Sequence, residues 1–117
     1  MKLTIERAAL LRSLNHVQSV VERRNTIPIL SNVHFNVQEE RLAMTATDMD
    51  LAIIETVDAA PKSGGATTAP AHTLYDIVRK LPEGTQIGLD ANGEEDRLIL
   101  TSGRSRFTLQ TLPTADF

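Results

Sequence analysis

The spacing of the apolar residues changes from the period of a strand to the period of a helix and back, and it does so twice. Leu3 and Ile5 alternate with polar residues, as in a strand with one buried face. Leu10, Leu14, Val17 and Val21 then recur at helical spacing, and Pro28 requires that helix to end before it. Three alternating runs follow, namely Val33–Val37, Leu42–Met44 and Leu51–Val57. The first half therefore predicts a β-α-β-β-β unit.

The same order returns after Pro61-Lys62-Ser63-Gly64-Gly65, which we interpret as a linker. A strand at Ala66–Ala69 precedes a helix at Ala71–Leu81 whose inward residues are Leu74, Val78 and Leu81. The remaining strands contain Ile87 and Leu89, Leu98 and Leu100, and Phe107 and Leu109. The segment Arg41–Thr45 is also echoed by Arg97–Thr101. The pattern predicts an α+β fold made of a duplicated unit, with two antiparallel sheets related by a pseudo-twofold axis and two helices side by side.

Length and composition restrict the kind of protein. The 117 residues suit one domain, residues 1–117. The sequence has no Cys, which excludes disulfides, iron–sulfur clusters and thiol catalysis. The first residues lack the apolar stretch of a signal peptide, and no run approaches the roughly 20 apolar residues of a membrane helix. We expect a cytoplasmic domain without a membrane partner.

Charge is separated along the chain. The formal net charge is −3, yet residues 7–24 carry +3, residues 71–81 carry +1 and the remainder carries −7. Basic residues thus gather on the expected helices and acidic residues on the strands and turns. Such a surface attracts a polyanion to the helical side only, although solvated charges on helix surfaces explain the same count.

Catalytic and metal-binding arrangements are weak. Asp48 and Asp50 have a spacing that suits a metal ligand pair, but a turn capped by Asp explains them better. His16, His34 and His72 lie on different elements without a metal-binding motif. Ser63-Gly64-Gly65 lacks the spacing of a phosphate-binding loop. We predict no catalytic residue, no metal and no cofactor, and hence no enzyme.

Six blocks in the sequence, in order, resemble those of the bacterial DNA sliding clamps, the beta subunits of DNA polymerase III. The most specific is Arg24–Asn32, which resembles R-x-T-[IL]-P-I-L-x-N, and Leu42–Asp48 resembles L-x-x-T-x-T-D. The others are Ala66–Ala71, Leu81–Gly84, Ser102–Phe107 and Leu112–Phe117.

This resemblance implies the first of three domains of a protomer. Two such protomers would close head-to-tail into a ring around double-stranded DNA and tether the replicative polymerase as a processivity factor. The polymerase and an ATP-driven clamp loader would bind mainly through later domains. The alternative is a protein-interaction module that acts through the Phe107–Leu109 strand without DNA.

The resemblance also implies roles for individual residues. Arg24 matches the arginine that contacts DNA inside the ring, and other basic residues are phosphate neighbours by charge and placement: Arg7, Arg12, Arg23, Arg79 and Lys80. Phe107 and Leu109 match the apolar part of the edge strand at the protomer junction, where we expect an exposed apolar patch. Basic residues that pair with acids across the junction are Arg97, Arg104 and Arg106. His72 and Thr73 stand where some relatives are basic.

Overall fold

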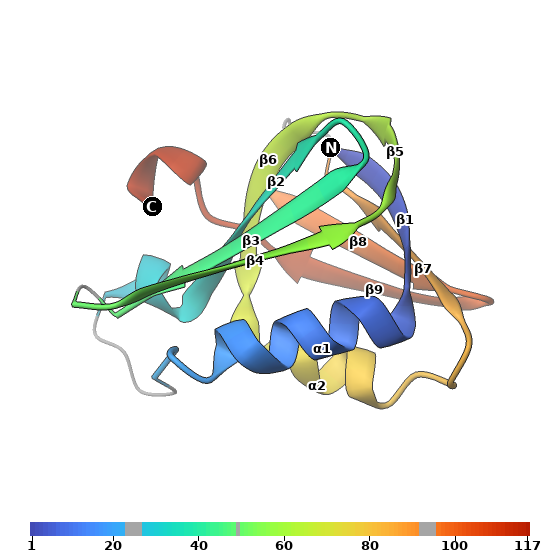
Figure 1. The fold of residues 1–117 in the computed structure, drawn as a ribbon, viewed down its shortest axis with the longest axis horizontal. Helices are drawn as coiled ribbons and strands as arrows, with labels where there is room; N and C mark the ends of the chain where they lie inside the picture. The colour runs from blue at the N-terminus through green and yellow to red at the C-terminus, as the bar shows by residue number, and fades with distance from the viewer. Residues whose placement is uncertain (23–26, 49, 92–95) are drawn as a thin grey trace.

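The computed structural model describes residues 1–22, 27–48, 50–91 and 96–117. Two helices pack against two antiparallel sheets (Figure 1). The helices are α1 (Arg7–Gln18) and α2 (Ala71–Arg79), with short 3₁₀ turns at Pro28–Ser31 and Thr114–Asp116. The strands are β1 (Lys2–Glu6), β2 (Asn32–Gln38), β3 (Arg41–Thr47), β4 (Ala52–Asp58), β5 (Ala60–Ser63), β6 (Gly65–Pro70), β7 (Gln86–Asp90), β8 (Arg97–Ser102) and β9 (Ser105–Gln110).

Each half of the chain contributes its first strand to the sheet of the other half. The four-stranded sheet has the order β4-β3-β2-β6, and the five-stranded sheet has the order β5-β1-β7-β8-β9. Strand β6 opens the second half but pairs with β2, while β1 opens the first half but pairs with β7. This exchange gives the predicted duplicated α+β fold with its pseudo-twofold relation.

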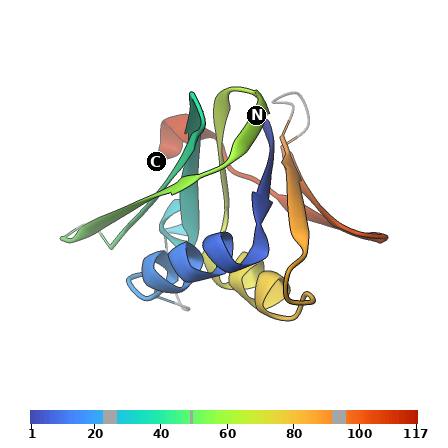
Figure 2. The same cartoon turned by 45° about the vertical axis from the view of Figure 1, so that its right-hand side comes forward.

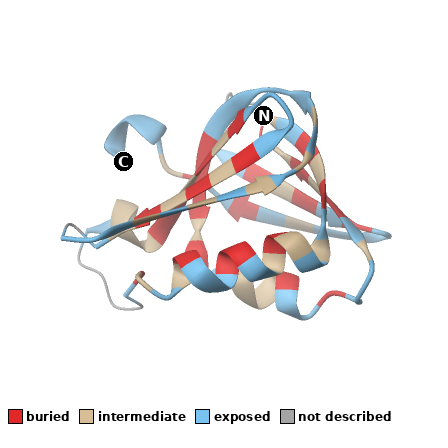
Figure 3. Ribbon diagram, viewed as in Figure 1, coloured by how far each residue is buried: buried red, intermediate tan, exposed pale blue. Residues whose placement is uncertain are grey.

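The core lies where the two sheets and the two helices meet. Figure 2 shows α1 and α2 side by side below the sheets, and Figure 3 shows that buried positions on the helices face the strands. The predicted inward residues of the helices, among them Leu10, Leu14, Leu74 and Val78, are fully buried. Alternating strand residues fill the rest of the core with aliphatic side chains and Phe35. The hydrophobic periods therefore predicted the buried faces of both helices and most strands.

Three expectations were wrong in detail. The segment interpreted as a linker contains β5, which pairs with β1 at the sheet edge, where a proline such as Pro61 is tolerated. Leu51 is 57% exposed and precedes β4, because its N–H is bonded by the Asp48 side chain in the turn. Val21 and Leu81 are buried as predicted, but they lie beyond the ends of α1 and α2.

Candidate nucleic-acid interface and sheet edges

The layer formed by α1 and α2 presents three of the predicted basic residues to solvent. Arg12 lies exposed on α1, and Lys80 is exposed directly after α2. Arg79 is exposed as well, although its Nε donates to Asp76 Oδ1 at 3.1 Å. Arg12 and Lys80 have no hydrogen bond or ion pair with the part of the chain that the structure describes, so their charges are available to a polyanion.

Arg7 has a different environment from the one its charge suggested. Its Nε donates to Val78 O at 3.1 Å and its Nη2 donates to Arg79 O at 2.9 Å. These carbonyls belong to the last turn of α2, where helix carbonyls lack partners within the helix and the helix dipole favours a cation. Arg7 therefore joins the start of α1 to the end of α2. No sequence signal pointed to this contact, because the two residues lie in different halves.

Arg23 and Arg24 lie outside the described residues. The chain that leads to them is fixed at Val21, whose carbonyl oxygen lies 2.7 Å from Nε2 of His72 on α2. The other imidazole nitrogen, Nδ1, is enclosed and has no partner among the described residues. His72 is thus engaged in a contact between α2 and the end of the α1 region, and neither nitrogen is directed to solvent as a phosphate contact.

Strand β9 forms one edge of the five-stranded sheet, as the resemblance implied. Just after β9, the Thr111 N–H donates to Asp96 O at 2.9 Å. Together with the register, this bond shows which residues of β9 direct their backbone groups toward β8. Bonded pairs in an antiparallel ladder recur at every second residue. The backbone N–H and C=O groups of Arg106, Thr108 and Gln110 therefore face the open side of the edge.

The two apolar residues of β9 differ in exposure. Leu109 is 5% exposed and belongs to the core, so its side chain offers no surface to a partner. Phe107 is half-buried and lines a hollow of about 490 Å³ between β9 and α2, together with Ile77, Leu81 and Pro82. The apolar surface beside this edge thus combines Phe107 with Ile77 of α2 and with Leu81 and Pro82 after its end, which the sequence had not associated with the edge. The larger exposed apolar side chains lie elsewhere, at Ile27, Leu51, Ile54 and Phe117.

The three arginines assigned to the junction lie close to this edge. Arg104 is exposed in the β8–β9 turn, Arg106 is exposed on β9, and Arg97 is exposed at the start of β8. In sheet register, Arg97 lies opposite Gln110 and Arg106 lies opposite Thr101. The edge is therefore flanked by positive charge along its length, which favours an acidic partner strand and disfavours indiscriminate pairing.

The carboxylates and histidines considered for catalysis do not form a site. Asp48 Oδ1 accepts from the N–H groups of Asp50 and Leu51, at 3.0 and 2.7 Å, as expected for a turn cap. His16 Nδ1 contacts Glu55 Oε1 at 2.9 Å, and His34 lies against the Phe117 ring. Burial lowers the pKa of His34 from its ordinary value of 6.5. In the described ranges, no group of three or more such side chains is placed to hold a metal ion.

No helix within the described ranges has the length and apolar composition needed to cross a membrane.

Comparison with known families places the whole chain in one group. The profile described as "DNA polymerase III beta subunit, N-terminal domain" matches residues 1–117. The beta sliding clamp of Caulobacter vibrioides is 58% identical over 117 residues, and that of Escherichia coli K12 is 44% identical over 118 residues. Each match covers 100% of this chain and 32% of the relative, so the chain spans about a third of the length of these relatives.

Solved structures give the same grouping. The crystal structure of the DNA polymerase sliding clamp from Caulobacter crescentus has a TM-score of 0.97 and 58% identity, and the match covers all of this chain and 32% of that chain. A sliding clamp from Pseudomonas aeruginosa has a TM-score of 0.92 at 42% identity, with coverage of 100% and 31%.

Proposed function

Because this chain belongs to the DNA polymerase III beta subunit family and matches its N-terminal domain from residue 1 to residue 117, we propose that it is the first domain of a DNA sliding clamp. The full-length match carries the proposal, and it agrees with the resemblance seen in the sequence. The protein would act as a processivity factor in the cytoplasm. It would encircle duplex DNA and tether a replicative polymerase, with no bond made or broken by this chain.

The helical layer supports the placement of DNA. Arg12 and Lys80 are exposed there without acidic partners in the described part of the chain, and Arg79 is exposed beside Asp76. Contacts between such side chains and phosphates are independent of base sequence and weaken with salt. Weak contacts of this kind allow the protein to slide, because they do not hold it at any particular base. Arg24 is a proposed contact on the resemblance alone, and Arg23 is proposed from its charge and its place in the sequence.

The edge strand β9 supports the placement of a second protomer. Its outward backbone groups at Arg106, Thr108 and Gln110 can extend the sheet into a partner strand. Arg97, Arg104 and Arg106 would pair with acids of that partner, and Phe107 would fill part of the apolar contact. Leu109 would act only through its backbone, since its side chain is buried. Polymerase and clamp loader would bind through domains that this chain does not include.

The test is topological. The full-length protein is placed on nicked circular duplex DNA by a clamp loader and ATP, and its release is followed after the circle is cut. We expect retention on the circle and loss from the linear form, because a ring leaves only over an end. Equal binding to both forms would contradict encirclement and favour an ordinary surface contact.

A double variant tests the DNA surface, and self-association is measured beside it. Arg12→Ala with Lys80→Ala should shorten retention and reduce the salt dependence of DNA binding by about one phosphate contact per residue. Arg41→Ala, an exposed arginine at the start of β3, is the matched control and should change neither. If DNA behaviour is unchanged in the helix variants while self-association persists, the protein is an interaction module and the DNA role is wrong.

A further inference from the structure

The duplication makes the outer faces of the two sheets comparable residue by residue. Register places Gly88 of β7 between Thr4 of β1 and Thr101 of β8. In the other sheet, the same register places His34 of β2 between Thr68 of β6 and Thr45 of β3. Both rows face away from the core, because the neighbouring residues on each strand are buried. The two rows therefore occupy equivalent positions.

The row on the four-stranded sheet is covered by the chain itself. Thr68 is fully buried, and its Oγ1 donates to Leu112 O at 2.8 Å and accepts from the Leu112 N–H at 3.0 Å. Asn32 Nδ2 donates to the same oxygen at 3.0 Å. His34 lies under the Phe117 ring, with 5.3 Å between ring centroids. A peptide segment thus sits on this row, and its backbone satisfies the Thr68 hydroxyl.

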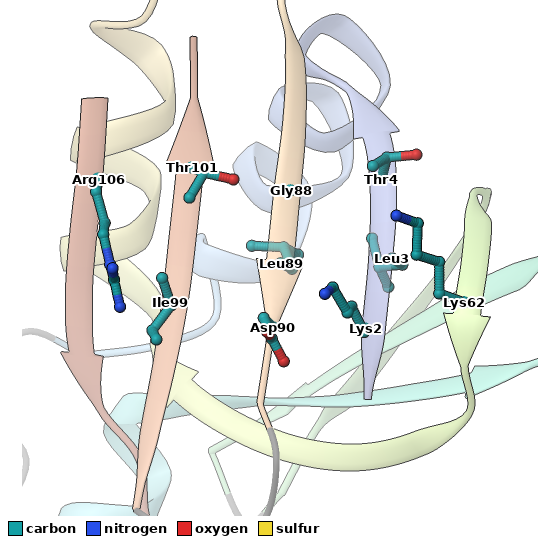
Figure 4. A pocket seen from close by; sticks show the side chains of 10 residues that line it. All are labelled: Lys2, Leu3, Thr4, Lys62, Gly88, Leu89, Asp90, Ile99, Thr101 and Arg106. Carbon is teal, nitrogen blue, oxygen red and sulfur yellow. The ribbon is translucent and has the colours of Figure 1, made fainter. Parts of the chain in front are cut away.

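The row on the five-stranded sheet is open. A hollow of about 380 Å³ lies above Gly88, and Thr4 and Thr101 flank it (Figure 4). A Cβ atom at position 88 would lie 2.6 Å from Thr101 Oγ1, so a larger residue there would force the Thr101 side chain to move. Neither threonine hydroxyl has a hydrogen-bond partner in the part of the chain that the structure describes. Glycine inside a strand is unfavourable in itself and marks close approach of another group, which here is the Thr101 side chain.

Positive charge surrounds the hollow. Lys2 of β1, Lys62 of β5 and Arg106 of β9 line it, against one carboxylate, Asp90 (Figure 4). None of the three cations has an ion pair within the described ranges, and all three are exposed. The remainder of the chain outside the helices is strongly acidic, so this concentration of cations is local. In the proposed dimer Arg106 would pair with the second protomer, so an anionic group above Gly88 would meet Lys2, Lys62 and the two hydroxyl donors.

We propose that this outer face of the five-stranded sheet binds an acidic peptide segment of a partner protein, with one carboxylate seated above Gly88 between Thr4 and Thr101. The covered row on the other sheet shows that a peptide fits at this position of the fold. These cations surround one point and have the Asp90 carboxylate beside them. They therefore suit a single acidic side chain better than the continuous row of phosphates along a duplex. The face also points away from the core and its helices, and thus from the proposed DNA surface.

The experiment measures binding of a fluorescein-labelled hexaglutamate peptide to the full-length protein by fluorescence anisotropy at low salt. Lys62→Glu should weaken binding about fivefold or more, since an exposed attraction becomes a repulsion. Gly88→Ala should weaken it as well without a change of charge, because the added Cβ displaces Thr101 into the hollow. Arg41→Glu, which reverses one exposed charge on the other sheet, is the matched control and should leave the affinity unchanged within twofold.

Each outcome decides the proposal. Absence of peptide binding overturns it, and equal weakening by Lys62→Glu and Arg41→Glu shows general electrostatic attraction and overturns it too. Displacement of the peptide by short duplex DNA, together with loss of DNA binding in Lys62→Glu, would assign the face to nucleic acid instead. Lys62→Gln repeats the test if Lys62→Glu lowers the thermal unfolding midpoint. Retention on circular DNA reports the clamp function separately, since neither Lys62 nor Gly88 is placed at the DNA surface or the junction.

Discussion

Strands β4 and β9 hold equivalent places at the edges of the two sheets, yet they offer different surfaces. Pairing with equivalent positions of β3 and β8 shows which edge residues correspond. Ile54, which is 64% exposed, corresponds to Arg106, and Glu55 corresponds to Phe107. Beside β4, Glu55 is bonded to His16 of α1. Beside β9, the corresponding space next to α2 is an open hollow that Phe107 lines.

This difference distinguishes the residues that form the core from the residues that face partners. The inward residues of the two halves are aliphatic at equivalent positions, such as Leu42 in β3 and Leu98 in β8, and both are fully buried. The outward residues at the same strands differ in charge and shape. A duplicated fold can therefore pack both halves in the same way while its two edge strands differ. Strand β9 is basic and contains an aromatic residue, whereas β4 is acidic and contains an exposed isoleucine.

The largest expected effect concerns the buried residues that the two halves share. Leu42→Ala and Leu98→Ala should each lower the free energy of unfolding by about 2–5 kcal/mol, because each leaves a cavity in the same core. Urea unfolding followed by far-ultraviolet circular dichroism measures both. A loss below about 1 kcal/mol for one variant alone would break the equivalence of the two halves.

The next effect compares the two outer rows. Thr68→Val should cost about 1–3 kcal/mol, because the buried Asn32 amide and the partly buried backbone groups of Leu112 lose their partner. Thr4→Val, the equivalent change on the other sheet, should stay within about 0.5 kcal/mol. The same unfolding measurement serves, and equal costs would show that the covered and open rows do not differ in energy.

A third prediction sharpens the contrast between the edges. Arg97→Glu in the full-length protein should weaken self-association about tenfold, because reversed charge opposes an acidic partner strand beside β9. Arg41→Glu changes the residue that is equivalent in register, and it should leave self-association unchanged. Sedimentation equilibrium across a dilution series measures both constants. Equal effects would remove the proposed distinction between the two sheets.

A smaller effect is expected at the pair that closes the space between α1 and β4. Glu55→Gln should lower stability by less than about 1 kcal/mol, since the His16 side chain is 51% exposed and Glu55 is 29% exposed. Urea unfolding measures the loss, and a value above about 1 kcal/mol would show that the contact contributes more than an exposed pair.

The smallest effect belongs to His34 under Phe117. Burial lowers the pKa of His34 below 6.5 in the folded chain, so the unfolded chain binds the proton more readily. Stability from this residue is present above pH 6.5 and is lost as the pH falls from 6.5 toward the folded value. His34→Gln should flatten that part of the profile of thermal midpoint against pH. A profile that matches the wild type would show that the residue does not contribute.

Much of the fold followed from local pattern, because burial on one face imposes a period on each element. The strands and helices were predicted where alternation or helical spacing was clear, as at Val33–Val37 and Leu10–Val17. β5 was missed because Pro61 and two glycines suggest a turn, while pairing with β1 at an edge decided the outcome. Arg7 was predicted as a phosphate neighbour from its charge, but its partners Val78 and Arg79 lie in the other half. Contacts between distant segments leave no mark on local sequence.

The exchange of β1 and β6 between the sheets has a consequence for how the protein is made. Lys2 pairs with Asp90 and Glu6 pairs with Gln86, so the five-stranded sheet joins residues separated by most of the chain. During synthesis the pairing of β1 with β7 must wait until β7 leaves the ribosome, whereas β5 is available to the other side of β1 earlier. Such distant pairing also slows folding, since a long loop must close before the contacts form. We therefore expect the duplicated halves to fold together, because each sheet needs a strand from the other half.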